Sequence, residues 1–161
     1  MRPGEVCGLD KRDRDGNIIN INRSINADGE ITSGKNANAN RSFYLNPTQQ
    51  QILDNQADML RSLGIVTKWI FPAPDGGPAS ERNMYKAWLT YCKQHGFKCS
   101  LYELRHTFVS YAEGKVPVKL LKSVVGHSES MDTFGTYGHQ IDGEMQIAAG
   151  YLDSVFQDIL K

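Results

Sequence analysis

The residues that could carry out chemistry fall into four short clusters. These are Arg2–Leu9, Lys35 with Arg41 six residues on, Tyr102–Phe108, and Val125–His127 followed by Thr136–His139. Arginine is suited to phosphate, because its planar guanidinium binds two oxygens at once and stays charged at any working pH. Tyrosine hydroxyls become nucleophiles once the proton is lost. These residue types are therefore compatible with chemistry on a phosphodiester.

Each candidate residue also has an ordinary structural explanation. Arg2, near the start of the chain, is explained as a solvated charge, and Lys35 as a surface lysine. Arg105 on a helix is explained by a surface ion pair, and His127 after a glycine by a helix-end cap. Tyr137 is explained as a core or interface residue. No single residue decides between these explanations and a reactive site, so the argument depends on their order and spacing.

The order of the motifs resembles that of the tyrosine recombinases, also called phage integrases. Arg-Pro-Gly-Glu, a hairpin lysine, Leu-Arg-His-Thr-Phe, Gly-His-Ser and Thr-x-Tyr-x-His follow one another, and the tyrosine lies ten residues after the Gly-His histidine. The resemblance covers essentially the whole chain. It implies an enzyme that cleaves and rejoins DNA strands through a 3′-phosphotyrosine link, for DNA integration or excision. Because the covalent link conserves the bond energy, no ATP, cofactor or metal is implied.

The resemblance also implies a role for each matching residue. Arg2 and Arg105 match the two arginines that hold the non-bridging oxygens of the scissile phosphate. Lys35 matches the hairpin lysine that acts as general acid to the leaving 5′-oxygen. His127 matches the position that hydrogen-bonds the phosphate, and Tyr137 matches the nucleophile.

The chain departs from the family pattern at Tyr102, where the family usually has a histidine three residues before the second arginine. The i, i+3 spacing places Tyr102 on the same helical face as Arg105, so it can still reach the site and donate a hydrogen bond. Its high pKa makes it a poor general base at neutral pH. His127 or a water molecule is then expected to take the Tyr137 proton, at a reduced rate.

A second departure concerns the start of the chain. Family members carry an N-terminal DNA-binding domain, and their catalytic domain begins a helix or more before the first arginine, which here is Arg2. We therefore interpret residues 1–161 as one catalytic domain that lacks both the DNA-binding domain and the first catalytic-domain helix. Such a fragment is expected to bind DNA weakly and to be inactive in recombination by itself.

Composition is consistent with one intracellular domain. The 161 residues are 22% charged and 40% hydrophobic, with neither a signal-peptide pattern nor an apolar run of the ~20 residues that cross a bilayer. A cytoplasmic, DNA-associated protein is expected. The formal net charge is zero, but 17 of the 18 bases and only 14 of the 18 acids precede Gln140, so the body is mildly basic. Three cysteines without metal-binding spacing predict free thiols.

The hairpin lysine must be positioned by strands. Asp15-Gly16 and Asp28-Gly29 are turn signals, and short apolar segments flank them. Strands are predicted at 18–21, 30–32 and 41–45, with Lys35 in the polar loop 34–40 between the last two. These predict a small three-stranded antiparallel sheet.

The remaining positions are expected on helices. Glu5–Leu9 reads as the end of a helix whose earlier turns are absent, and Ser80 and Ser100 with Glu103 are start signals. Helices are predicted from 48 to 63, 80 to 95, 101 to 112, 116 to 125, in part over 130 to 137, and 142 to 160. The fold class is thus mainly α with a small three-stranded antiparallel sheet, the tyrosine recombinase catalytic-domain fold.

The tail helix at 142–160 carries an apolar stripe that must be buried somewhere. The resemblance implies that it docks in trans onto the next protomer of a homotetramer on double-stranded DNA. A helix packed in cis against its own core is the alternative. Two other functions also stay open: a truncated, catalytically weak remnant that only binds DNA or a protein, and a type IB topoisomerase that relaxes DNA by the same chemistry.

Overall fold

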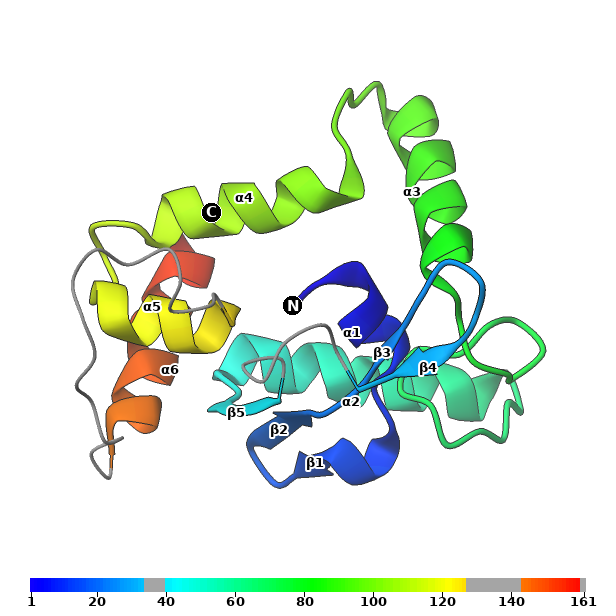
Figure 1. Ribbon diagram of the computed structural model, residues 1–161, viewed down its shortest axis with the longest axis horizontal. Helices are drawn as coiled ribbons and strands as arrows, with labels where there is room; N and C mark the ends of the chain where they lie inside the picture. The colour runs from blue at the N-terminus through cyan, green and yellow to red at the C-terminus, as the bar shows by residue number, and fades with distance from the viewer. Residues whose placement is uncertain (34–39, 127–142, 160–161) are drawn as a thin grey trace.

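The computed structural model of the chain describes residues 1–33, 40–126 and 143–159. Two short helices and then all the described strands lie in the first third of this chain, and the later described elements are helices (Figure 1). The elements are α1 (Pro3–Cys7), η1 (Lys11–Asp13), β1 (Arg14–Asp15), β2 (Ile18–Ile21), β3 (Ser24–Ile25), β4 (Ile31–Thr32), β5 (Arg41–Tyr44), α2 (Pro47–Ser62), α3 (Glu81–His95), α4 (Leu101–Ala112), α5 (Val118–Val125) and α6 (Glu144–Ile159).

Capping residues set the bounds of α3 and α4 where the sequence predicted them. The Ser80 hydroxyl accepts a hydrogen bond from the backbone N–H of Asn83 at 3.2 Å, and Gly96 ends α3 with a φ of 73°. At the start of α4, the Ser100 hydroxyl accepts from the Glu103 N–H at 3.2 Å, while the Glu103 carboxylate accepts from the Ser100 N–H. This reciprocal pair is the predicted capping box.

The first helix differs from the expectation that residues 5–9 end a longer helix. α1 begins at Pro3, whose fixed φ and missing N–H suit the first helical position. Its third residue, Glu5, accepts a hydrogen bond from the Arg2 backbone N–H at 2.7 Å. The start of α1 therefore includes Arg2, which was predicted to bind phosphate.

The sheet has three antiparallel strands, as predicted, but one of them is a different segment. β1 pairs with β2 and β2 pairs with β5, whereas β4 pairs with β3 in a separate hairpin. Asp15-Gly16 therefore turns the chain inside the sheet, with Gly16 at a φ of 57°. The prediction that residues 30–32 join the sheet is wrong, because the Asn26 side chain accepts from the N–H groups of Asp28 and Glu30 and folds this segment back onto β3.

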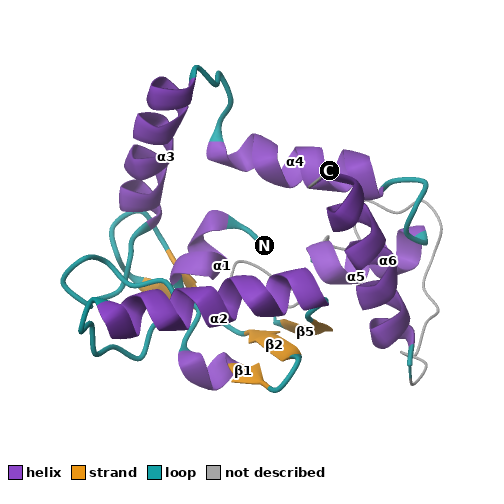
Figure 2. Ribbon diagram, turned by 180° about the vertical axis from the view of Figure 1, so that it is seen from behind, coloured by secondary structure: helices purple, strands orange, loops and turns teal. Residues whose placement is uncertain are grey.

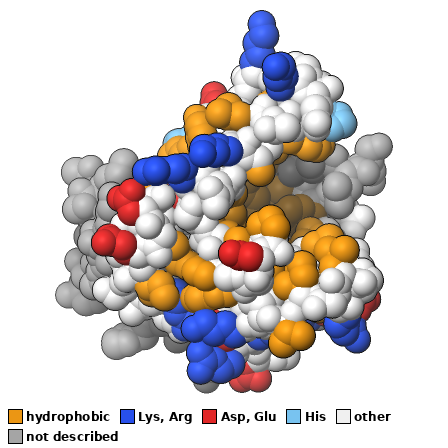
Figure 3. All heavy atoms as spheres, turned by 90° about the vertical axis from the view of Figure 1, so that its right-hand side faces the viewer, with side chains coloured by type: hydrophobic (Ala, Val, Ile, Leu, Met, Phe, Trp, Pro, Cys, Tyr) orange, Lys and Arg blue, Asp and Glu red, His pale blue; other side chains and the backbone are white. Residues whose placement is uncertain are grey.

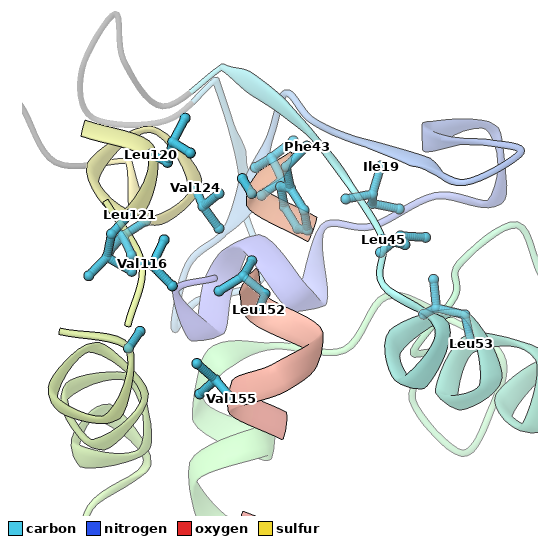
Figure 4. Close-up of a cluster of buried hydrophobic side chains, with 14 of the residues drawn as sticks. Ile19, Phe43, Leu45, Leu53, Val116, Leu120, Leu121, Val124, Leu152 and Val155 are labelled. Atoms are coloured by element: carbon cyan, nitrogen blue, oxygen red, sulfur yellow. The ribbon is translucent and has the colours of Figure 1, made fainter. Parts of the chain in front are cut away.

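The main core joins the sheet to the later helices, as the labelled side chains in Figure 4 show. Phe43 of β5 and Ile19 of β2 are buried together with Val124 of α5 and with Leu152 and Val155 of α6. Although α6 follows β5 by about a hundred residues, it completes the same core. The tail helix therefore packs in cis in this structure.

α3 and α4 meet end to end and extend away from α2 and the sheet, with α1 between them and the rest (Figures 1 and 2). Over the described residues, no helix combines the length and apolar character that a membrane crossing would require. The predicted helix at 130–137 and the loop that carries Lys35 lie outside the described residues.

Candidate phosphate-binding site

Three arginines from distant parts of the chain bind the last carbonyls of α5. Arg41 Nε donates to the carbonyl of Val124 at 3.0 Å, and Arg105 Nη2 donates to that of Val125 at 2.7 Å. Arg2 Nη2 donates to the carbonyl of Gly126 at 3.0 Å. Because these carbonyls belong to consecutive residues, the three guanidinium groups are neighbours. The last carbonyls of a helix have no N–H partner within the helix. At the end of α5, arginines from β5, α4 and the start of α1 supply these donors, so the three elements meet there.

Glu5 connects two of these arginines through a buried carboxylate that is 4% exposed. Its Oε1 accepts from Arg2 Nη1 at 3.0 Å and from Arg41 Nη1 at 2.9 Å. Its Oε2 accepts from the Arg2 N–H and from Arg41 Nη2 at 2.9 Å. Burial raises the pKa of Glu5, but the hydrogen bonds from Arg41 and from the Arg2 backbone outweigh burial and hold the pKa at about 2. Glu5 is therefore ionised and fully hydrogen-bonded.

Arg105 is buried, at 9% exposure, yet its hydrogen bonding is incomplete. Nη1 of Arg105 is buried without a hydrogen-bond partner among the described residues. Burial, and then the neighbouring charge of Arg2, lower the pKa of this guanidinium. A cavity of about 310 Å³ adjoins it, lined mostly by apolar side chains that include Pro3, Leu104 and Phe108. A buried guanidinium with an unused donor is a site for an anion.

The charges around the end of α5 do not cancel. Arg2, Arg41 and Arg105 bring three positive charges, while Glu5 supplies one negative charge. The carbonyl end of a helix adds only about half a negative charge. Among the described residues, a net positive charge therefore remains at a site with an unused N–H donor on Arg105, which is the electrostatic requirement for holding a phosphate.

Tyr102 lies one turn before Arg105 on α4 and is 48% exposed. Its ring makes an edge contact with His106, with ring centroids 5.0 Å apart. The i, i+3 spacing places Tyr102 on the same side of α4 as Arg105, with its ring partly exposed.

Comparison with known protein families gives one decisive match. The family model described as the phage integrase family matches residues 1–144. The chain belongs to the phage integrase family. A search of curated protein sequences gave no match.

Solved phage-integrase-type recombinases share the fold. The XerA recombinase is 18% identical with a TM-score of 0.61, covering 98% of this chain and 50% of its own. The Tn1549 transposon integrase bound to transposon right-end DNA is 18% identical with a TM-score of 0.63, covering 99% and 54%. The same integrase with circular-intermediate DNA is 16% identical with a TM-score of 0.66, covering 100% and 56%. The chain thus spans about half the length of these recombinases.

Two of the predicted site residues come together in this member of the family, and three cannot be placed. Arg2 and Arg105 lie side by side at the end of α5. Lys35, His127 and Tyr137 lie outside the described residues. In the part of the chain that is described, no cluster of three His, Cys, Asp or Glu side chains is arranged to hold a metal ion.

Sequence reasoning gave no role to Glu5 or Arg41, which the structure places at the centre of the site. Glu5 was inside the Arg-Pro-Gly-Glu motif, and Arg41 was noted only for its spacing from Lys35. The available signal was a charged residue at the start of a strand, two positions before an apolar one, since Arg41 and the buried Phe43 share one face of β5. The partner of Arg41, 36 residues away, was not visible in the sequence.

This chain also presents an exposed basic segment, made of α3 and the three residues that follow it. Between residues 81 and 98 there are four exposed bases and one acid; the bases are Arg82, Lys86, Lys93 and Lys98. Figure 3 looks onto the side of the molecule that carries α3, where Lys and Arg side chains project at the top above a hollow lined by hydrophobic side chains. The charge excess that composition predicted for the body is therefore concentrated in part on α3.

Proposed function

We propose that this chain is the catalytic domain of a site-specific DNA recombinase that cleaves and rejoins strands through a 3′-phosphotyrosine intermediate. The observation that carries the proposal is the pair Arg2 and Arg105 at the end of α5, with a surplus of positive charge and an unused donor on Arg105. In the transition state of phosphoryl transfer, negative charge grows on the non-bridging oxygens, and prearranged guanidinium donors stabilise it. Membership in the phage integrase family supports the same reaction.

The other steps are assigned to residues outside the described part of the chain. The Tyr137 oxygen attacks phosphorus, and the bond to the 5′-bridging oxygen breaks. Lys35 gives its proton to that leaving oxygen, and His127 hydrogen-bonds the phosphate. Because Tyr102 replaces the usual histidine and a phenol is a poor general base at neutral pH, His127 or water accepts the Tyr137 proton. Attack by a second strand's 5′-hydroxyl reverses these steps and releases the enzyme.

Double-stranded DNA is the proposed substrate, and α3 is a source of phosphate contacts. Its exposed bases outnumber acids, and two of the solved relatives are in complex with DNA. A lysine that neutralises one phosphate contributes about 0.9 to the slope of log affinity against log salt concentration. Lys93→Gln should reduce the slope by about this amount. The matched control is Lys11→Gln on η1, which lies away from α3 and should leave the slope unchanged.

Assembly into a homotetramer on DNA, with α6 docked in trans, is part of the proposal. Its support is the apolar stripe of α6, which in this structure buries Ala148, Leu152 and Val155 in cis. If two protomers exchanged their α6 helices, each helix would make the same core contacts, but with the other copy of the chain. Deleting residues from Asp142 onward tests this. Loss of tetramers on DNA with a folded monomer favours exchange, whereas global unfolding shows that the cis position is required.

The test of the main proposal is covalent trapping on a nicked suicide substrate, from which the cleaved fragment diffuses away. The wild-type chain should form a protein–DNA adduct, and Tyr137→Phe should form none. The matched control is Tyr151→Phe on α6, the other candidate nucleophile, which should still form the adduct. An adduct with Tyr137→Phe contradicts the assignment, and no adduct with the wild type favours a remnant that only binds DNA.

Relaxation of supercoils without strand exchange would indicate topoisomerase activity instead.

The role of Lys35 is tested with sulfur in place of the 5′-bridging oxygen, since a thiolate leaves without protonation. Lys35→Ala should cleave ordinary DNA about 10²–10⁴-fold more slowly, the usual size of general acid catalysis. Its rate on the sulfur substrate should approach that of the wild type. Equal slowing on both substrates would remove Lys35 from this role.

A further inference from the structure

We propose that Arg41 is a positioning residue for strand cleavage, which fixes Arg2 and the end of α5 in the arrangement that receives the phosphate. The inference rests on the proposed function, and it adds a residue to which the proposed mechanism gives no step. Arg41 donates hydrogen bonds to groups of the protein. Its Nε donates to the Val124 carbonyl, and its Nη1 and Nη2 donate to the two oxygens of Glu5. It therefore differs from Arg105, which keeps a buried donor unused.

The Arg41 side chain is 8% exposed and enclosed by the groups that it holds. A Cβ atom on Gly126 would lie 2.8 Å from Cζ and Nη1 of Arg41 and 3.0 Å from Nε, closer than such atoms approach. Gly126 also has a φ of 73°, which favours glycine. The Arg41 guanidinium thus packs closely against the turn at the end of α5. Residue 127 follows this turn directly in the sequence.

Arg41 controls Arg2 through their shared carboxylate. Glu5 Oε1 accepts from both arginines, and two of the four hydrogen bonds to Glu5 come from Arg41. Without Arg41, Arg2 would be the only cation hydrogen-bonded to a buried carboxylate. Attraction to Glu5 would then compete with the Arg2 contact at the Gly126 carbonyl, and Arg2 would be displaced from its place beside Arg105.

A single side chain therefore holds two parts of the site. On one side it holds Glu5 and, through it, Arg2. On the other it holds the Val124 carbonyl and the turn that leads to His127, the proposed phosphate ligand. Misplacement of a catalytic group by about 1 Å can slow a reaction about 100-fold. Arg41 should consequently affect the rate of cleavage rather than the affinity for DNA.

The experiment measures single-turnover cleavage of the nicked suicide substrate by the full chain, per folded molecule. Arg41→Lys keeps the charge and loses the planar fork. It should cleave about 100-fold more slowly and bind DNA within about twofold of the wild type. The matched control is Arg23→Lys. Arg23 likewise donates from both terminal nitrogens to a buried carboxylate, that of Asp13, and also to the backbone carbonyl of Gly8. Its replacement should leave the cleavage rate unchanged.

A double-mutant cycle separates positioning from a general structural effect. In an Arg2→Ala background, Arg41→Lys should slow cleavage by much less than about 100-fold, because one of the two parts of the site that Arg41 holds no longer contributes. The same 100-fold slowing in both backgrounds would overturn the proposal, as would an unchanged rate for Arg41→Lys. If Arg41→Lys does not fold, Glu5→Gln breaks the same contact from its partner side, and an unchanged cleavage rate there overturns the proposal. An inactive wild type would overturn the proposed function itself. An active wild type with an unaffected Arg41→Lys variant would overturn only the role of Arg41, so the two failures are distinguishable.

Discussion

Two helix starts in this chain use the same local device but differ in charge. At α1, Glu5 accepts from the Arg2 N–H and from the fork of Arg41. At η1, Asp13 accepts from the Asp10 N–H at 2.7 Å and from the fork of Arg23. Each carboxylate is 4% exposed, and each caps the residue three positions before it.

The difference lies in what surrounds each pair. Near Asp13 there are two acids and two arginines, because Asp10 is paired with Arg12 at 2.8 Å. Among the described residues, there are three arginines and one acid near Glu5, and Arg105 has a buried donor without a partner. The cluster around Asp13 is balanced in charge, whereas the cluster around Glu5 has positive charge and a donor in excess. Residual charge and unused donors therefore distinguish the proposed phosphate site from a structural ion pair.

The sharpest test of this difference is Arg105→Lys, which keeps the charge but removes the fork. Cleavage should fall by about 10²–10³-fold, as when one prearranged transition-state donor is lost. The melting temperature should barely change, because only one of the terminal nitrogens of Arg105 has a partner in the described chain. Suicide-substrate kinetics and thermal unfolding measure the two effects. A large loss of melting temperature with cleavage per folded molecule intact would make Arg105 structural.

The pH dependence of the unfolding free energy tests the contribution of Glu5 and its arginine partners. The folded-state pKa of Glu5 is about 2, below its ordinary value of 4.5, so its contribution is complete above about pH 4.5 and is lost as the pH falls toward 2. The difference in unfolding free energy between wild type and Glu5→Gln should shrink by up to about 3 kcal/mol over this window. Denaturant titrations between pH 7 and 3 provide the measurement. A constant difference would mean that Glu5 is not held ionised by its arginines.

On the balanced side, Asp13→Asn should affect stability alone. The change leaves Arg23 with a weaker, neutral partner, and a hydrogen bond to a charged group contributes about 2 kcal/mol. Urea unfolding should show a loss of this size, while the cleavage rate per folded molecule stays at the wild-type level. Slower cleavage at unchanged stability would show that the two clusters are coupled.

The smallest effect is expected for an ion pair that faces solvent. Arg61 and Asp58 form an i, i+3 pair on α2 with both side chains mostly exposed. Arg61→Ala should change the unfolding free energy by about 0.5 kcal/mol or less, because such pairs are screened by water. A loss as large as that of Asp13→Asn would contradict the view that burial separates the two kinds of pair.

The sequence predicted those features that depend on neighbouring residues. Ser80 with Gly96 and Ser100 with Glu103 fixed the bounds of α3 and α4, because capping is local. Arg2 and Arg105 were assigned to the site through short motifs, and the structure places both at the end of α5, while their role in cleavage stays a prediction. The strand at 30–32 was placed wrongly, since two-residue strands carry little pattern and the Asn26 turn decides their partner.

The cluster around Glu5 could not be predicted, because its members are joined only by the tertiary fold. Arg41 is separated from Glu5 by 36 residues and from Val124 by 83. No periodicity or cap relates positions so far apart. The roles of Lys35, His127 and Tyr137 stay predictions, as these residues lie outside the described chain.

The packing of α6 on β5 has a consequence for the synthesis of the protein. Ribosomes add about 5–20 residues per second, so the hundred or so residues between Tyr44 and Glu144 take about 5–20 seconds to make. Throughout that interval the apolar side chains of β2 and β5 lack the helix that completes their core. The nascent chain therefore presents an open strand surface long before it can close, and chaperone binding during translation should be concentrated on residues 18–45.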